Sequence, residues 1–110
     1  MQPLHMKYIE ETLDENGVLT DIKFNVPKDF NFAYDVVDEL ARTKGGDLAM
    51  IWSNDLGEKH YFTFQDMKDG SDRAAKAFQQ QGIGKGDMVM LILKRHYHFW
   101  FAILALNKLG

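Results

Sequence analysis

The chain has no cysteine among its 110 residues. This absence excludes disulfides, thiol catalysis and cysteine-ligated zinc. An excess of positive charge is also lacking, because 13 Lys and Arg stand against 16 Asp and Glu and leave a net charge of −3. A nucleic-acid partner is therefore not expected, since such proteins carry a basic footprint. The first fifteen residues lack the apolar core of a signal peptide, so we predict a cytoplasmic protein.

Long apolar runs are scarce as well. The longest is the eight-residue stretch FWFAILAL at residues 99–106. About 20 consecutive apolar residues are needed to span a bilayer, and Lys94, Arg95 and Lys108 flank this run, so no transmembrane segment is predicted. Eight apolar residues exceed two helical turns, and a helix that is apolar all round is typical of the interior of a larger protein. The sequence thus predicts a piece of a larger protein that self-associates through residues 97–109 when isolated.

Hydrophobic periodicity predicts an alternation of helices and strands. A hairpin over residues 48–64 is indicated by two apolar runs around the turn sequence Asn54-Asp55-Leu56-Gly57. The continuous run MVMLIL predicts a strand buried on both faces, as in parallel sheets. The fold class is therefore α/β. Helices are expected at about 6–14, 32–43, 65–81 and 97–109, and strands at about 18–27, 48–53, 59–64 and 88–93.

Local signals place several helix ends. Either Asp29 or Asn31 is a plausible N-cap for the helix at 32–43. Thr63 with Asp66 three residues later forms a capping-box pattern for the next helix. Gly45-Gly46 is expected to end the first of these helices in a left-handed conformation.

Residues 82–86, GIGKG, invite comparison with a phosphate-binding loop. Such a loop needs a strand before the glycines and a helix after them, so that helix amides meet the phosphate. Here the predicted order is reversed, and the pattern favours a helix end followed by a tight turn.

The remaining polar residues show no catalytic pattern. His96 and His98 are two apart, so on a helix they point to nearly opposite faces and cannot share a metal ion. Lys94 and Arg95 end the predicted buried strand, where ligands of open α/β sheets often bind, although solvated charges at a strand end are the commoner case. His5 and His60 are isolated in the sequence and indicate no site. We expect a solvated helix face to carry the three carboxylates Asp35, Asp38 and Glu39. No histidine–acid pair accompanies the possible nucleophiles Ser53, Thr63 and Ser71.

Three segments resemble the opening of adenylate-forming acyl-CoA synthetases, the AMP-binding enzyme family, and in particular its acetyl- and medium-chain acyl-CoA synthetase branch. They are FNFA with DVVD at 30–38, YFTFQDM at 61–67, and GIGKGDMV at 82–89 followed by the run at 99–110. Two positions depart from the family, which usually has proline at Lys94 and often an acidic residue at His98. The resemblance covers about four-fifths of the chain. Residues 1–23 carry little of it, so we expect them to form an amino-terminal extension that contains the short helix predicted at 6–14. Residues 24–110 would begin a large, layered amino-terminal domain.

The resemblance also implies an AMP-forming acid–thiol ligase of fatty acid metabolism. Its carboxylate substrate attacks the α-phosphate of ATP with Mg²⁺, and coenzyme A then displaces AMP from the acyl-adenylate. The family's phosphate loop, its adenine- and ribose-binding acids and its catalytic lysine all lie downstream of residue 110. No catalytic, cofactor-binding or metal-binding residue is therefore expected here, and the chain would be an inactive scaffold part. The alternative is a self-contained α/β interaction module that dimerises through its carboxy-terminal helix.

Overall fold

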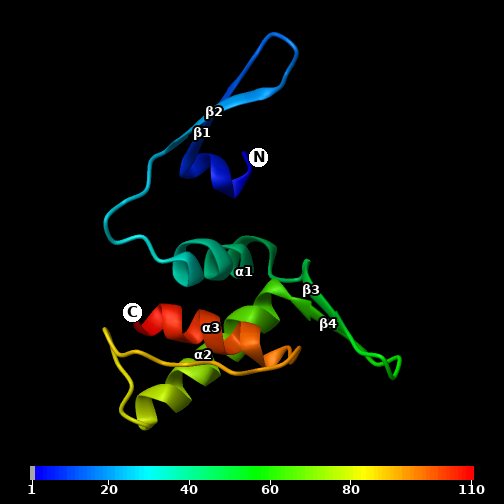
Figure 1. Cartoon of the computed structure of the whole chain (residues 1–110), viewed down its shortest axis with the longest axis vertical. Helices are drawn as coiled ribbons and strands as arrows, with labels where there is room; N and C mark the ends of the chain where they lie inside the picture. The colour runs from blue at the N-terminus through cyan, green and yellow to red at the C-terminus, as the bar shows by residue number, and fades with distance from the viewer. Residues whose placement is uncertain (1) are drawn as a thin grey trace. The chain divides into compact units, whose positions relative to one another are not determined.

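The computed structural model describes residues 2–110, which divide into a small unit up to Phe30 and a larger unit Asn31–Gly110. The small unit begins with a 3-10 helix, η1 (Leu4–Lys7), and continues into a hairpin of β1 (Ile9–Leu13) and β2 (Leu19–Phe24) (Figure 1).

The hairpin of the small unit is antiparallel, with Ile9 opposite Phe24. The Asp14 carboxylate accepts hydrogen bonds from two turn amides, and Gly17 supplies the positive φ of 78° that the turn needs. The extended segment predicted at 18–27 is thereby confirmed. The helix predicted at residues 6–14 is wrong, because its weak apolar side gains less than pairing with β2 offers across a well-formed turn.

The larger unit starts with one continuous helical segment, a π-helical stretch η2 (Ala33–Asp38) followed by α1 (Glu39–Lys44). This confirms the helix predicted at 32–43. Asn31 caps it, because its side-chain oxygen accepts the Tyr34 N–H at 3.2 Å. Gly45 ends the helix with φ of −55°, so the left-handed end predicted for Gly45-Gly46 is wrong.

The predicted hairpin is confirmed as β3 (Leu48–Ser53) paired antiparallel with β4 (Lys59–Thr63). It leads directly into α2 (Phe64–Gln80), where the capping box between Thr63 and Asp66 is present in both directions. The last helix, α3 (His98–Leu109), confirms the helix predicted at 97–109. Helices and two antiparallel hairpins together make the chain α/β, as the sequence predicts.

Within the larger unit, the helices gather around a core, while the hairpin β3–β4 projects to one side (Figure 1). The core is built from η2, α2 and α3, and Phe62 and Phe101 pack against it. The buried apolar members are Ala33, Val37, Met67 and Leu104. No helix in the described part of the chain is long and apolar enough to cross a membrane.

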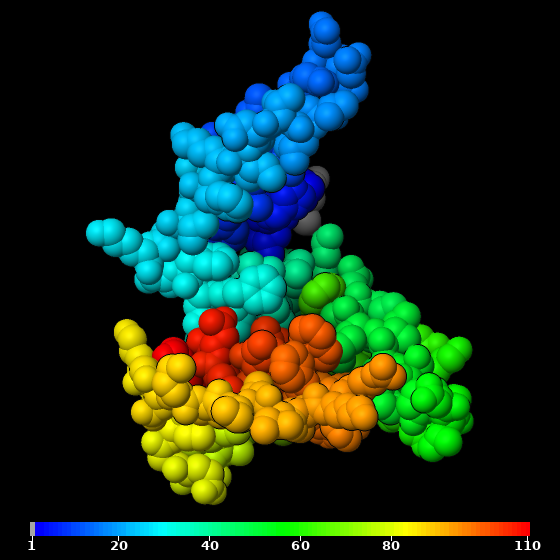
Figure 2. Space-filling view, in the orientation of Figure 1, coloured from blue at the N-terminus to red at the C-terminus, as the bar shows by residue number. Residues whose placement is uncertain are grey.

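Residues 88–93 do not form the buried strand that the apolar run predicts. Met88, Met90 and Ile92 are 97%, 83% and 84% exposed, while Val89 and Leu91 are half-buried. The segment therefore alternates in exposure as a strand does, but both sheets within residues 2–110 are two-stranded hairpins that do not include it. A strand needs neighbouring backbone to bond with, and this segment finds none here. In Figure 2 the segment lies on the surface, in yellow to orange.

Helix α2 packs tightly on α3 at Gly70. A Cβ atom at this position would lie 2.6 Å from Cδ1 of Phe101. We expect Gly70→Ala to lower the free energy of unfolding by about 1–3 kcal/mol, because the Phe101 ring must shift within a packed core. Urea unfolding followed by tryptophan fluorescence measures this. Ala77→Gly, at an exposed α2 position, is the control, because it measures the difference in helix propensity between Ala and Gly without a packing change. An unchanged or increased stability of Gly70→Ala would show that α3 does not pack closely on α2.

Candidate functional site

The most organised polar group of the structure surrounds Lys108, near the end of α3. Its Nζ atom lies 2.9 Å from Oδ1 of Asp38 and 2.6 Å from Oδ1 of Asp72. The lysine side chain is only 1% exposed. Its ammonium group also stands over the Tyr34 ring, 5.3 Å from the centroid. One buried cation thus ties η2, α2 and α3 together.

Asp72 is shared between two lysines. Its other oxygen, Oδ2, accepts from Lys68 Nζ at 2.6 Å. Partial burial by itself would raise the pKa of the Asp72 carboxyl, but the hydrogen bonds from Lys108 and Lys68 outweigh burial, so its pKa is lowered. The hydrogen bond to Asp72 in turn raises the pKa of Lys68. Both groups remain ionised at neutral pH, and their pairing is structural.

The lowered pKa of Asp72 gives the cluster a predictable pH dependence. A carboxyl whose pKa is depressed in the folded state stabilises the fold above its unfolded pKa of about 3.9. This contribution is lost as the pH falls through the lower, folded-state pKa. We therefore expect the urea midpoint to fall more steeply from pH 5 downward in the parent chain than in Asp72→Asn. Asp55→Asn, in an exposed turn, is the matched control; equal slopes for all three proteins would show that Asp72 is not paired in solution.

Three carboxylates of the first helical segment, those of Asp35, Asp38 and Glu39, make different contacts. Asp35 accepts the Asn31 N–H at 2.8 Å, and Glu39 holds Arg42 on the helix surface. The expectation of one solvated acidic face is wrong for Asp38, whose side chain is 14% exposed and paired with Lys108. The sequence misses this pairing because it joins residues 70 positions apart. No pair of carboxylates is left for acid–base chemistry among these three residues.

The glycine-rich segment follows α2 and forms a turn. Gly84 N–H donates to the Asp87 carboxylate at 2.8 Å, and Gly86 N–H donates to the Gly110 carbonyl at 2.9 Å. Helix precedes this turn, as the sequence predicts. These two amides are therefore engaged by the protein itself, and the arrangement does not resemble a phosphate cradle.

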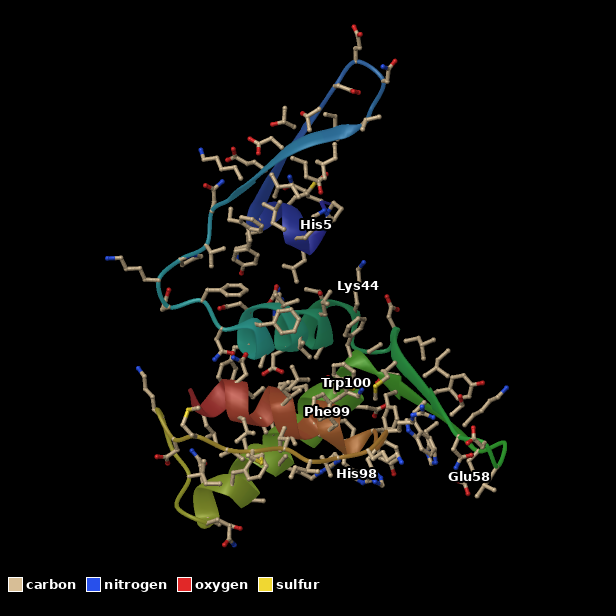
Figure 3. All side chains as sticks on the ribbon, in the orientation of Figure 1. His5, Lys44, Glu58, His98, Phe99 and Trp100 are labelled. Atoms are coloured by element: carbon tan, nitrogen blue, oxygen red, sulfur yellow. The ribbon has the colours of Figure 1, made fainter. Side chains whose placement is uncertain are left out.

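The charged residues before α3 are exposed. Arg95 adopts a left-handed conformation with φ of 55°, and its carbonyl accepts the indole N–H of Trp52 at 2.8 Å. His98, labelled in Figure 3 at the start of α3, stacks on Tyr97 with ring centroids 4.2 Å apart. His96 is exposed. No group of three or more possible metal ligands occurs within the described residues 2–110.

His60, which the sequence leaves without an assignment, belongs to an aromatic cluster between the hairpin and α3. Its ring lies 5.5 Å from Trp52, 6.2 Å from Phe62 and 5.3 Å from Tyr97. His5, in the small unit, approaches Glu11 at 3.9 Å. Both histidines make ordinary structural contacts, and neither faces a nucleophile.

The hydroxyl groups of Ser71 and Thr63 bond to the backbone. Ser71 is fully buried and donates to the Lys68 carbonyl at 3.0 Å. Thr63 caps α2, while Ser53 pairs opposite Lys59 at the end of β3. The most buried ion pairs among these polar groups form an ionic clamp, defined here as Lys108 with Asp38 and Asp72.

The larger part of the chain matches a known protein family. The family model described as "AMP-binding enzyme" matches residues 37–110, about two-thirds of the chain. The chain belongs to the AMP-binding enzyme family. The matched residues include all three members of the ionic clamp, the hairpin β3–β4 and both α2 and α3.

Curated relatives in the AMP-binding enzyme family agree with this. The chain is 31% identical over 105 residues to the mitochondrial acyl-coenzyme A synthetase ACSM4 of Rattus norvegicus, covering 90% of the chain and 18% of the relative. It is 33% identical over 96 residues to the mitochondrial ACSM3 of Homo sapiens, covering 82% and 16%. An acetyl-coenzyme A synthetase of Halorhodospira halophila is 32% identical over 91 residues, covering 82% and 14%. The chain therefore spans less than a fifth of the length of these relatives.

Proposed function

We propose that this chain is a scaffold part of an ATP-dependent acyl-CoA synthetase. The observation that carries the proposal is the family match over residues 37–110, in a structure whose polar groups serve packing. The unpaired segment 88–93 supports it, because extended backbone with alternating exposure is suited to join a larger sheet.

The proposed reaction of the complete protein has two steps. A carboxylate oxygen of the substrate attacks the α-phosphorus of ATP, the bond to the β-phosphate oxygen breaks, and pyrophosphate leaves. The coenzyme A thiol then attacks the acyl carbonyl carbon and loses its proton, and AMP departs to leave a thioester. Mg²⁺ would offset the charge of the phosphates. We assign none of these groups to residues 2–110, whose turn amides and buried lysine are already engaged.

The role of this chain is then mechanical. The ionic clamp fixes α3 against α2 and η2. A short connection, residues 94–97, joins the extended segment 88–93 to α3. Holding α3 in one place therefore holds the segment at a defined position for the rest of the enzyme. A cytoplasmic location is part of this proposal, although two of the relatives are named as mitochondrial.

We expect the isolated chain to bind neither Mg-ATP nor coenzyme A. Titration calorimetry at micromolar to millimolar ligand concentration should give no saturable heat, because no cradle for phosphates is open. Saturable micromolar binding of either ligand would contradict the assignment of the cofactor sites to other parts of the enzyme.

A second candidate function is the self-contained interaction module that dimerises through α3. The half-exposed Trp100, 50% accessible, and Ile103, 41% accessible, favour it. Reading the coding region beyond the Gly110 codon distinguishes the two. A frame that continues into a Ser/Thr/Gly-rich segment supports the synthetase, and a stop codon supports the module.

A further inference from the structure

An apolar groove, called here the α3 groove, runs along one side of α3. It has a volume of about 710 Å³ and is lined by residues from η2, β3, α2 and α3. Its walls include Phe32, Val37, Ile51, Met67, Trp100 and Ile103. In Figure 3, Trp100 lies on the side of α3 nearer to α1.

The groove leaves much of its apolar lining open to water. Phe32 is 52% exposed, Ile51 56%, Trp100 50% and Ile103 41%. Four large apolar side chains from three parts of the chain gather around one hollow, whereas scattered exposed residues would need no explanation. Contiguous apolar surface of this kind marks a place that another surface covers.

Two acceptor atoms at the groove, both from Asn107, are engaged within the protein. Asn107 is the one polar lining residue, and its side-chain oxygen accepts the Ala33 N–H at 2.9 Å. Its carbonyl accepts the Asn31 side chain at 2.7 Å. The groove thus carries no charge and keeps these acceptors occupied, so the chemistry of its occupant is apolar side chains. A polar metabolite such as a nucleotide does not fit.

We propose that an apolar segment of the same polypeptide, beyond Gly110, covers the α3 groove. The inference rests on the proposed function. The matched relatives are several times longer than the chain, since 14–18% of their length corresponds to it. The proposed function places the remaining polypeptide after residue 110. The helix that forms one wall ends at Leu109, two residues after the lining residue Asn107. Chain continuing from Gly110 therefore starts within one helical turn of the end of the groove, at the point where the Gly110 carbonyl accepts the Gly86 N–H.

A second copy of the chain fits less well. A two-fold interface places the same surface of both partners together, and two concave hollows facing each other leave a void. Stable dimers also bury about 800 Å² on each partner with interior-like packing. A convex, apolar element of the same polypeptide fills the hollow without that mismatch and without the loss of translational freedom.

Single cysteines test this directly, because residues 1–110 contain none. Ile103→Cys is made in the complete polypeptide, with Leu56→Cys as the control at a turn position that is 85% exposed. A water-soluble maleimide is the probe, and peptide mass spectrometry reads each site separately from any other cysteine. We expect labelling at position 103 to be at least tenfold slower than at position 56, at every protein concentration. Ile51→Cys, on the opposite wall of the groove, serves as the second variant if the first fails to fold.

Each outcome decides the inference. Slow labelling that does not depend on concentration supports coverage by the same polypeptide. Labelling as fast as at position 56 overturns it, and so does protection that disappears on dilution, which would identify a second copy. Carboxylate-dependent ATP–pyrophosphate exchange is measured on the same preparations. If the enzyme is active and the thiol at position 103 reacts rapidly, the inference is wrong and the proposed function is retained. If the reading frame stops at Gly110, both are wrong.

Discussion

Replacing Lys108 with alanine should lower the free energy of unfolding of the chain by about 2–4 kcal/mol. Removing one partner of a buried ion pair is costly because the remaining charge is left without compensation. Of the two carboxylates left behind, Asp38 is the less exposed, at 14%, while Asp72 is 42% exposed and keeps Lys68. The expected loss therefore lies below the largest values for such pairs. Urea unfolding followed by the fluorescence of Trp52 and Trp100 measures the change.

Two further variants separate charge from packing. Lys76→Ala, at an exposed position on α2, should change stability by less than about 0.5 kcal/mol. Lys108→Met keeps an apolar stem of similar length, and adding Asp38→Asn to it should recover part of the loss by removing the stranded carboxylate. A loss below about 1 kcal/mol for Lys108→Ala would show that the clamp does not hold α3.

The isolated chain should self-associate at micromolar concentration. The α3 groove leaves aromatic and branched side chains open, and covering about 400 Å² on each of two chains contributes on the order of 20 kcal/mol before the costs of association. Because the groove does not complement itself, the products should be polydisperse and grow with concentration. Light scattering measures this directly.

Substitution within the groove should reverse the association. Trp100→Lys places a charge on the open wall and should shift the scattering mass toward that of one chain. Leu56→Lys, at an exposed turn away from the groove, should leave it unchanged. A clean, soluble monomer of the parent chain with Trp100 shielded from quenchers would mean that the chain closes its own core.

Locally encoded features are those that the sequence predicts well. The turn at 54–57 between two apolar runs indicates the β3–β4 hairpin, and the Thr63–Asp66 pair indicates the start of α2. The apolar run at 99–106 predicts α3. In each case the decisive interactions join residues a few positions apart, so they are visible in the spacing of the residues.

Features that depend on distant partners are not predictable in this way. Lys108 looks like a solvated residue at a helix end, because its partners Asp38 and Asp72 lie 70 and 36 positions away. Residues 9–13 fail as a helix for a similar reason, since their conformation is set by pairing with 19–24. The run at 88–93 has the composition of a central strand, yet composition cannot supply the neighbouring strands that its backbone requires.

The absence of a candidate catalytic residue is a prediction of the sequence that rests on the order of elements around residues 82–86 and on the family resemblance. The turn that Gly84 and Gly86 form agrees with the order that the sequence predicts. The α3 groove was not predictable, because its walls come from four elements whose mutual packing is a tertiary property.

We propose that this chain is part of the scaffold of an enzyme that activates a carboxylate as an acyl-adenylate. Exchange of labelled pyrophosphate into ATP by the complete polypeptide, with Mg²⁺ and a panel of short- and medium-chain carboxylates, is the decisive test of this proposal. We expect exchange that depends on the carboxylate, and we expect Lys108→Ala to reduce it sharply at temperatures where loss of the ionic clamp frees α3 from α2 and η2. Absence of exchange with every carboxylate, from a folded and complete protein, would contradict the proposal.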